Sequence, residues 1–527
     1  MSQKSHLDNN ISLNVYLDGS SVGKKGFGLP LLVTRFRDTV DALTGVDTGA
    51  KTFTVAGDRS AEAVVGRTLF LERSTGNDGR YTVVSATYTA LTLSTAIVVT
   101  EAVADATVDG RIVFTCMDYA LSVADIATKT FTFNGIQGLA SQWEAGDKIL
   151  LYGGNANDGI YTIVTATKVG QDLVVVVAET PASDTALGGG LLAYDGARAQ
   201  LYADGVGIDG DKAKMGVYTA AHLAVGLQQK PHSKYVLLGF WGLMEDDPAT
   251  AATAISLEND DWYGMAMDSR LPAHIAATAP DSTSMSAYLA GKEKIGVAQT
   301  DESELLDTPY DDTATAPDND VASVMKNLNR FNAHMNYHQY DKEFEDWALL
   351  CNRLGVDPDV SATIWTFVTL EGVTPDTTIT PTQGANMDGK NCNYYNTFGG
   401  VGSTGKGFTP KGDKIDLVIT AHWVAARLRE AYAAVLLNAT NSGSKIPYTD
   451  VGFQAFRGET EKILQQGVAA GHFAAGTTGI VIPALKDVPD ADRTARLLRI
   501  TAGAQPAGAV ESVAGDVYIS INFAIQV

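Results

Sequence analysis

Residues 76–87 read GNDGRYTVVSAT, and nearly the same stretch returns at 156–167 as ANDGIYTIVTAT. A second matching pair, AKTFTVAG at 50–57 and TKTFTFNG at 128–135, precedes each copy. Asn-Asp-Gly before a Tyr-Thr run is typical of a β-hairpin, because these turn residues tolerate a left-handed backbone. An internal repeat indicates two copies of one structural unit. We therefore expect two tandem all-β modules, at residues 39–117 and 118–200.

The rest of the chain has a different pattern. From residue 201 onward, strand-like runs such as KYVLLGFWG (234–242) and DWYGMAM (261–267) alternate with helix-like runs. The helix-like runs are TAAHLAVGLQQ (219–229), DVASVMKNLNRFNAHMNYH (320–338), DLVITAHWVAARLREAYAAVLLN (416–438) and GETEKILQQGVAAG (458–471). This alternation predicts a mixed α/β core, which the two β-modules interrupt. We assign residues 1–38 to an arm and the first part of this core, 201–501 to the core, and 502–527 to a linker and a second arm.

Both ends of the chain alternate apolar and polar residues with a period of two, which is the pattern of a half-buried β-strand. The apolar positions near the start are Ile11, Leu13, Val15 and Leu17. Those near the end are Val517, Ile519, Ile521, Phe523, Ile525 and Val527. Two terminal strands of this kind require partners, because a bare alternating strand is an aggregation hazard.

Composition narrows the functional class. The 527 residues include 39 basic and 61 acidic side chains, for a formal net charge of −22. Such a charge disfavours binding to nucleic-acid phosphates or to anionic lipid as a main role. The opening MSQKSHLDNN lacks the apolar core of a signal peptide, and no run of about eighteen apolar residues follows. The sequence therefore predicts a protein made and kept in the cytosol, with no membrane insertion.

The three cysteines, Cys116, Cys351 and Cys392, are far apart in sequence and odd in number. A disulfide framework or a cysteine-based zinc site would require closer or paired cysteines. We expect reduced, mostly buried thiols.

Three short motifs resemble catalytic or ligand-binding signatures, but each lacks a required neighbour. GSSVG at 19–23 places Ser21 as in a nucleophile elbow, although KKGFGLP cannot start the helix that must follow. GVGSTGKG at 400–407 resembles a phosphate-binding loop, but Gly407 stands after Lys406 where Ser or Thr is needed, so we expect a flexible loop. His334 and His338 share one helical face without a third ligand. We therefore predict no catalytic, metal or cofactor residues, and no enzyme.

The order of segments in the body resembles that of the tail-sheath proteins of contractile bacteriophage tails. The segments are ISLNVYL (11–17), KKGFGLPLLV (24–33), VYTAAHLAVGLQQKPHSKYVLLGFWG (217–242), NDDWYGMAM (259–267), KGDKIDLVITAHWVAARLREAYAAVLLN (411–438), KIPYTDVGF (445–453) and RLLRITAGAQPAGAVESVAGDVYISINF (496–523). The resemblance covers about residues 10–36 and 205–527. It rests on order, because none of the segments is a catalytic signature.

The resemblance implies a structural role in a virion. Sheath subunits exchange terminal strands with neighbouring subunits, form stacked rings around a tail tube, and contract to drive the tube through the host envelope. It implies further contacts with baseplate and tail terminator proteins, and assembly in the host cytoplasm. Strand exchange of this kind is β-augmentation, in which backbone hydrogen bonds supply affinity. We place the hinge of the C-terminal arm at Gly508 and Gly515.

The role of the repeats stays open between two interpretations. As insertions on the outer surface they could decorate and stiffen the tail. Alternatively, the chain could be a tail-associated adhesin or glycan-binding protein, using the aromatic residues Tyr81, Tyr88, Trp143 and Tyr161. A hydrolase built on Ser21 is a third interpretation, and it needs a histidine and a carboxylate within reach.

Overall fold

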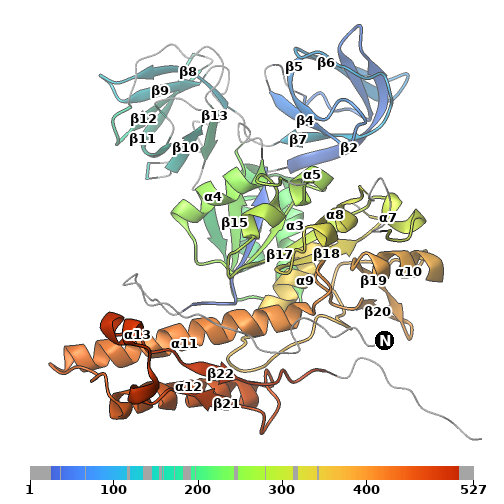
Figure 1. Ribbon diagram of the computed structural model, residues 1–527. Helices are drawn as coiled ribbons and strands as arrows, with labels where there is room; N and C mark the ends of the chain where they lie inside the picture. The colour runs from blue at the N-terminus through green and yellow to red at the C-terminus, as the bar shows by residue number, and fades with distance from the viewer. Residues whose placement is uncertain are drawn as a thin grey trace, which may run out of the picture.

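The computed structural model describes residues 25–35, 37–63, 65, 67–115, 119–133, 145–146, 148–152, 157, 159–170, 172–181, 192–195, 198–242, 247–278, 280–311, 319–340 and 343–509. Its central element is an eight-stranded sheet in the order β14-β15-β1-β16-β17-β18-β19-β20 (Figure 1). The strands are β1 Pro30–Thr34, β14 Ala199–Tyr202, β15 Val236–Phe240, β16 Gly264–Met267, β17 Ile295–Thr300, β18 Ala333–Tyr337, β19 Asn393–Phe398 and β20 Val401–Thr404. The predicted mixed α/β core is confirmed.

The sheet is parallel except at its two edges, where β14 and β20 run antiparallel to their neighbours. Strands β1, β15 and β16 are buried on both faces, which explains why their sequences are apolar runs rather than alternating ones. Strand β1 lies between β15 and β16, so a segment before residue 35 completes a sheet built mostly from residues after 198. The chain thus leaves the core after β1, forms the β-modules, and returns at β14.

Helices cover both faces of the sheet. They are α1 Gly205–Gly210, α2 Lys212–Met215, α3 Val217–Gln228, α4 Pro248–Glu258, α5 Pro272–Ile275, α6 Met285–Leu289, α7 Glu304–Asp307, α8 Val321–Asn327, α9 Glu345–Leu354 and α10 Pro381–Gly389. Helices α3 and α9 pack on one face, and α4 and α6 on the other. Each face has its own hydrophobic cluster, so the core has three layers.

Each sequence repeat forms a closed six-stranded barrel. The first contains β2 Arg37–Asp47, β3 Thr52–Ala56, β4 Thr68–Glu72, β5 Gly79–Thr89, β6 Ser94–Val99 and β7 Arg111–Thr115. The second contains β8 Tyr119–Asp125, β9 Thr130–Phe133, β10 Lys148–Tyr152, β11 Gly159–Val169, β12 Asp172–Val177 and β13 Leu192–Asp195. Both barrels lie on one side of the sheet (Figure 1). Closure leaves no free strand edge in a barrel.

The repeated tyrosines are core residues of the barrels. Tyr81 meets the ring of Phe53 edge-on at 4.9 Å, and Tyr161 meets Phe131 in the same way at 4.8 Å. Both hydroxyls donate to a backbone carbonyl four residues earlier, over 2.8 and 3.0 Å. Because both side chains are buried, they are not placed to bind a glycan. Of the other aromatic residues considered for this role, Tyr88 is half-buried and Trp143 lies outside the described residues.

A buried charge cluster joins the first barrel to the sheet. Arg37 donates from Nε to Asp268 Oδ2 over 2.7 Å, and from its two Nη atoms to Glu72 over 2.8 and 3.1 Å. Burial by itself raises the pKa of Glu72, but Arg37 and Arg111 outweigh that effect and lower it to about 2. The second repeat has Tyr152 where the first has Glu72, so its barrel lacks this carboxylate.

The contact between the first barrel and the sheet, called the joint below, also has an apolar part. The Arg35 guanidinium lies between the rings of Phe70 and Trp241, at 4.1 and 4.0 Å from their centroids. Val40, Phe70 and Val113, on the outside of the first barrel, belong to the same hydrophobic cluster as the core of the body. The first barrel is therefore packed onto the sheet through a shared hydrophobic cluster.

On the opposite side of the sheet, two long helices form a lobe (Figure 1). Helix α11 runs over Ile415–Asn441 and α12 over Asp450–Ala470, and they pack against each other. Gly471 ends α12 in the left-handed conformation, which glycine adopts without strain. The lobe also contains α13 Asp490–Ala495 and a two-stranded sheet of β21 Gly479–Val481 and β22 Thr501–Gly503.

Three local predictions were wrong. The helix expected over 320–338 ends at Asn327, and AHMNY forms strand β18, because the sheet buries this segment on both faces. The loop expected at 400–407 contains β20, which pairs with β19 through a hairpin whose glycines, Gly399 and Gly400, have positive φ. Helix α12 begins at Asp450 rather than Gly458, since the Thr449 side chain caps it.

Candidate subunit interface

The lobe carries a short β-ribbon whose outer edges are open. Strands β21 and β22 are three residues each, and among the described residues no third strand pairs with either. The pairing continues irregularly beyond β22: Ala474 N–H donates to Gln505 O over 2.9 Å, and Ala507 N–H donates to His472 O over 3.0 Å. An isolated two-stranded ribbon is marginally stable, so this one gains from any strand added to its edge.

Residues 25–27, called the N-terminal arm root below because they follow the predicted arm, are bound to α11. Lys25 N–H donates to Glu430 Oε1 over 2.6 Å, and Arg427 donates from Nη1 and Nη2 to the Lys25 carbonyl, each over 3.3 Å. Lys25 Nζ binds the carbonyl and the carboxylate of Glu293, over 2.6 and 3.2 Å. Burial lowers the pKa of this ammonium, although Glu293 opposes the effect. These contacts, called the clamp below, fix Lys25 against the body.

Asp359 binds Arg427, the arginine of this clamp, from the side opposite Lys25. Its carboxylate accepts from Arg427 Nε over 2.7 Å and Nη2 over 3.0 Å, and from Trp423 Nε1 over 2.7 Å. Arg427 also donates to both oxygens of Glu430, one turn along the same helix, over 2.8 and 2.9 Å. Burial by itself lowers the pKa of Arg427, but Asp359 and Glu430 outweigh that effect and raise it. The guanidinium is thus a charged anchor with two carboxylate partners.

The next residues of the arm root are packed into the core. Phe27 meets the ring of Tyr263 edge-on at 4.7 Å. The hydroxyl of Tyr263 hydrogen-bonds His422 Nδ1 over 3.0 Å. Burial, helped by the charge of Lys25, lowers the pKa of His422 to about 4, so its imidazole is neutral at neutral pH.

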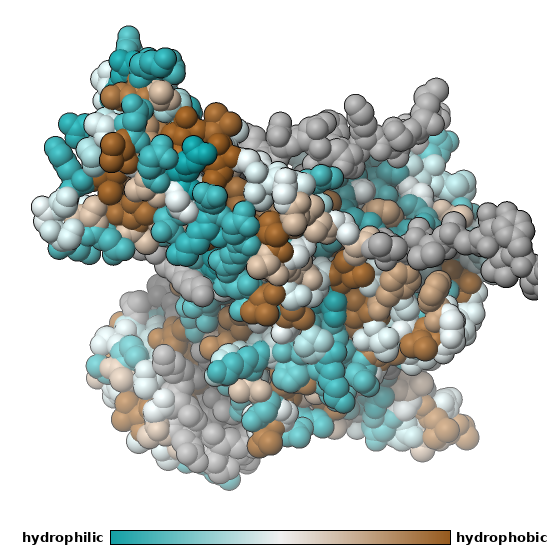
Figure 2. Space-filling view, turned by 90° about the horizontal axis from the view of Figure 1, so that it is seen from below, coloured by the Kyte–Doolittle hydropathy of each residue, from teal (hydrophilic) through white to brown (hydrophobic). Residues whose placement is uncertain are grey.

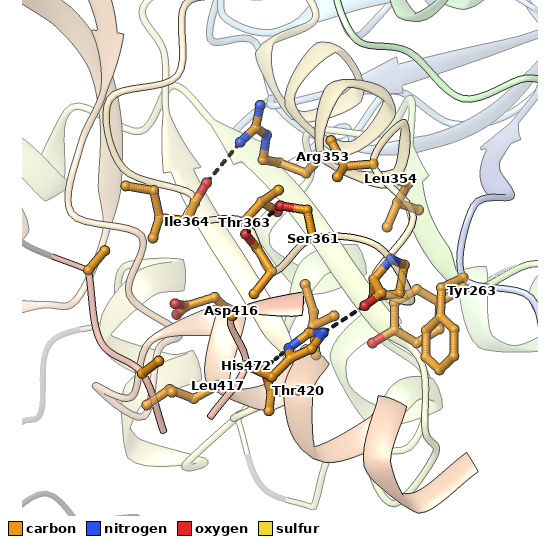
Figure 3. A pocket seen from close by; sticks show the side chains of 18 residues that line it. Tyr263, Arg353, Leu354, Ser361, Thr363, Ile364, Asp416, Leu417, Thr420 and His472 are labelled. Atoms are coloured by element: carbon orange, nitrogen blue, oxygen red, sulfur yellow. Dashed lines mark hydrogen bonds between the residues drawn. The ribbon is translucent and has the colours of Figure 1, made fainter. Parts of the chain in front are cut away.

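A cavity of about 160 Å³ lies beside the N-terminal arm root and beside residues 507–509, the C-terminal arm root, at the other end of the described chain (Figure 3). Its walls include Phe27 from the N-terminal root and Ala507 and Ala509 from the end of the described chain. The His472 imidazole forms part of the wall, held between Thr420 Oγ1 and the Pro358 carbonyl, 2.8 Å from each. Residues more than 470 positions apart in sequence therefore line one space.

Arg353 is a charged group at this cavity. It donates to the Ile364 carbonyl and to Asn352 Oδ1, each over 2.9 Å, and burial lowers its pKa to about 10 (Figure 3). These are neutral acceptors, so they hold the side chain in place without balancing its charge.

Apolar side chains reach the surface in several places on the face of the molecule seen from below (Figure 2). In the lobe, the exposed ones include Leu436, Leu437, Val451 and Val481, from α11, α12 and β21. Exposed apolar side chains that form a contiguous patch are typical of surfaces that bind other proteins.

The structure tests few of the residues singled out from sequence. The predicted arm residues lie outside the described residues: Ile11, Leu13, Val15, Leu17, Val517, Ile519, Ile521, Phe523 and Ile525. Gly515, Ser21 and Cys116 also lie outside them. Gly508 is described and exposed, and a Cβ there would meet nothing within 4 Å. The hinge therefore stays a prediction.

The other motif residues have structural partners. His334 lies in β18 against Trp365 at 5.2 Å, and His338 Nε2 is 3.0 Å from the Thr374 carbonyl. Lys406 pairs with Asp388. In the described part of the chain, no group of three or more His, Cys, Asp or Glu residues could hold a metal ion.

Cys351 and Cys392 are buried free thiols, as expected, and burial raises both pKa values. None of the described helices combines the length and hydrophobicity needed to span a membrane.

Several of the solved structures to which this chain is similar are of sheath proteins. One is in the contracted helical sheath of the anti-feeding prophage, with 13% identity over 61% of this chain and 87% of that one, at a TM-score of 0.41. Another is the sheath tail protein of Listeria innocua, with 9% identity over 93% of each chain and a TM-score of 0.35. A third is the sheath tail protein of Desulfitobacterium hafniense, with 8% identity over 95% and 98% of the two chains and a TM-score of 0.36. No protein-family model and no curated protein sequence matches the chain.

Proposed function

We propose that this chain is a structural subunit of a contractile tail sheath, which polymerises through exchanged terminal strands around a tail tube. One observation carries the proposal: both ends of the described chain lie beside one cavity, next to a ribbon with open edges. A subunit that has two strand-forming arms and a ribbon to receive strands can join copies of itself head to tail. The segment order described above supports the same role.

The mechanical part of the proposal rests on flexible connections between rigid bodies. An eleven-residue strand reaches about 36 Å at roughly 3.3 Å per residue, long enough to bridge to an adjacent subunit. The rings would first form in an extended state and then repack into a shorter, wider one, with the arms keeping the subunits joined. Gly508 and Gly515 are the proposed hinge, and unchanged contraction after both are replaced by proline would contradict that assignment.

The remaining assignments follow from this role. The partners are neighbouring sheath subunits, the tube, and the baseplate and terminator proteins at the two ends, and the location is the tail of a virion. The two barrels lie on the side of the sheet away from the ribbon (Figure 1), so as outward insertions they would not obstruct strand exchange. The role is mechanical and needs no catalytic residue.

The proposal can be tested by negative-stain electron microscopy. We would compare the full chain with one that ends at Gly515 and one that begins at Lys25. Long hollow sleeves from the full chain, and dispersed subunits from both truncated chains, are the expected result. Compact particles from all three would contradict the proposal, because the arms would then pair within their own subunit.

A further inference from the structure

The cavity beside the arm roots has the size and lining of a pocket for an aromatic side chain. Its volume is about 160 Å³, close to that of engineered apolar cavities that bind benzene. Its apolar lining includes Phe27, Leu354, Val356, Ile364, Leu417 and Ile419, and its polar lining includes Arg353, Asp416 and His472. An aromatic ring that packs on the apolar part of this wall is removed from water, which is favourable.

The cavity lies at the end of the β-ribbon. Ala507 and His472, which are joined by a backbone hydrogen bond of 3.0 Å, both line it. Phe473 and Pro506, the next pair along, form the last bridge of the ribbon. A strand laid along the open edge of β22 therefore runs from Thr501 toward the cavity.

We propose that the cavity receives the ring of Phe523 from the C-terminal arm of a second copy of the chain. This inference rests on the proposed exchange of arms. Phe523 is the only aromatic residue on the apolar face of that arm, among Val517, Ile519, Ile521 and Ile525. An arm running parallel to β22 with Val517 beside Thr501 brings Phe523 beside Ala507, because both intervals are six residues. Ring insertion would then fix the register that backbone pairing alone leaves free to slip.

Two substitutions should weaken assembly in the same way. Phe523→Ala removes the occupant, and Ala362→Phe fills the pocket from its wall. We expect each to lower the assembled fraction in sedimentation at least tenfold, and the double variant to be no worse than either single one. Ala491→Phe is the control, because Ala491 is exposed on α13 away from the cavity.

A disulfide experiment identifies the occupant directly. In the full chain, Ala362→Cys combined with Phe523→Cys should give covalent ladders of many subunits under oxidation, whether or not Ala362→Phe folds. Disulfides within single chains would overturn the inference, because the tail of the same subunit would then fill the pocket. It would also be overturned if Phe523→Ala assembled normally while the chain ending at Gly515 did not. Normal assembly of that truncated chain would instead overturn the proposed function.

Discussion

Arg37 and Asp268 form a buried ion pair between the first barrel and the sheet, with Nε and Oδ2 2.7 Å apart. Asp268 also accepts from Thr34 Oγ1 over 2.7 Å and from the Arg35 N–H over 3.2 Å. One carboxylate thus serves three donors at the point where the chain enters the barrel.

Asp268→Ala should destabilise the joint strongly, because it leaves Arg37 buried with Glu72 as its nearest carboxylate. Breaking a buried pair on one side typically costs about 3–5 kcal/mol. Urea denaturation of the purified subunit measures this loss. Asp261→Ala, at an exposed position, is the control and should change stability by less than about 0.5 kcal/mol. Equal stabilities of the two variants would show that the pair contributes little.

The subunit should lose stability in mild acid through its buried histidines. The pKa of His422 is about 4 in the fold against 6.5 ordinarily, so below pH 6.5 the unfolded chain binds a proton that the folded chain does not. The free energy of unfolding therefore falls as the pH falls from 6.5 to about 4, by about 1.4 kcal/mol per unit for each such histidine.

His422→Gln should remove the contribution of one histidine to this pH dependence. The glutamine can still accept from Tyr263, and it does not titrate. Unfolding free energies measured at about pH 7, 6 and 5 should fall less steeply for the variant. Parallel slopes for variant and parent would contradict the assignment of a neutral His422.

Glu430→Ala should weaken assembly more than folding. It removes the acceptor for the Lys25 N–H and one of the two carboxylate partners of Arg427, so the arm root is held less tightly. Losing about 1 kcal/mol of preorganisation corresponds to roughly fivefold weaker association. Sedimentation of the assembled fraction measures the effect. Glu459→Ala, on the surface of α12, is the matched control and should assemble normally.

Two glycines of α12 should respond oppositely to alanine. A Cβ at Gly467 would lie 2.5 Å from the ring of Phe473 and 3.1 Å from that of Trp423, whereas one at Gly458 would meet nothing within 4 Å. Gly467→Ala should therefore cost about 1–3 kcal/mol through overpacking. Gly458→Ala should gain about 0.5–1 kcal/mol from helix propensity. Thermal melting of both variants checks the packing of the lobe, and a loss at both positions would contradict it.

A charge on the open ribbon should block strand addition. Thr501 lies in β22 and is exposed, so Thr501→Lys should leave the fold intact. Lysines on edge strands oppose pairing with further strands. Electron microscopy should show shorter or fewer sleeves for this variant, and normal ones for Val206→Lys, at an exposed position of α1. Normal sleeves from both would place strand exchange elsewhere.

Much of the fold could be predicted from local patterns. The Asn-Asp-Gly repeats led to the strands of the two barrels, and apolar periodicity led to α3 and α11. The sequence was ambiguous where helix and strand patterns overlap, as at His334. That residue continues a helix-like run, but the tertiary structure makes it part of a buried parallel strand. Gly452 and Gly458 similarly weaken the helical pattern in the sequence of the first turns of α12. In the structure, the Thr449 cap and the packing against α11 stabilise these turns.

The candidate interface was far less predictable. The sequence alone showed that both termini alternate apolar and polar residues, and it predicted that they need partners. The tertiary structure alone brought Lys25 to Glu430, 405 positions away, and placed Phe27 and Ala509 at one cavity. The physical reason is that strand and helix patterns arise from neighbours two to four residues apart, whereas a clamp or a cavity arises from packing between distant segments.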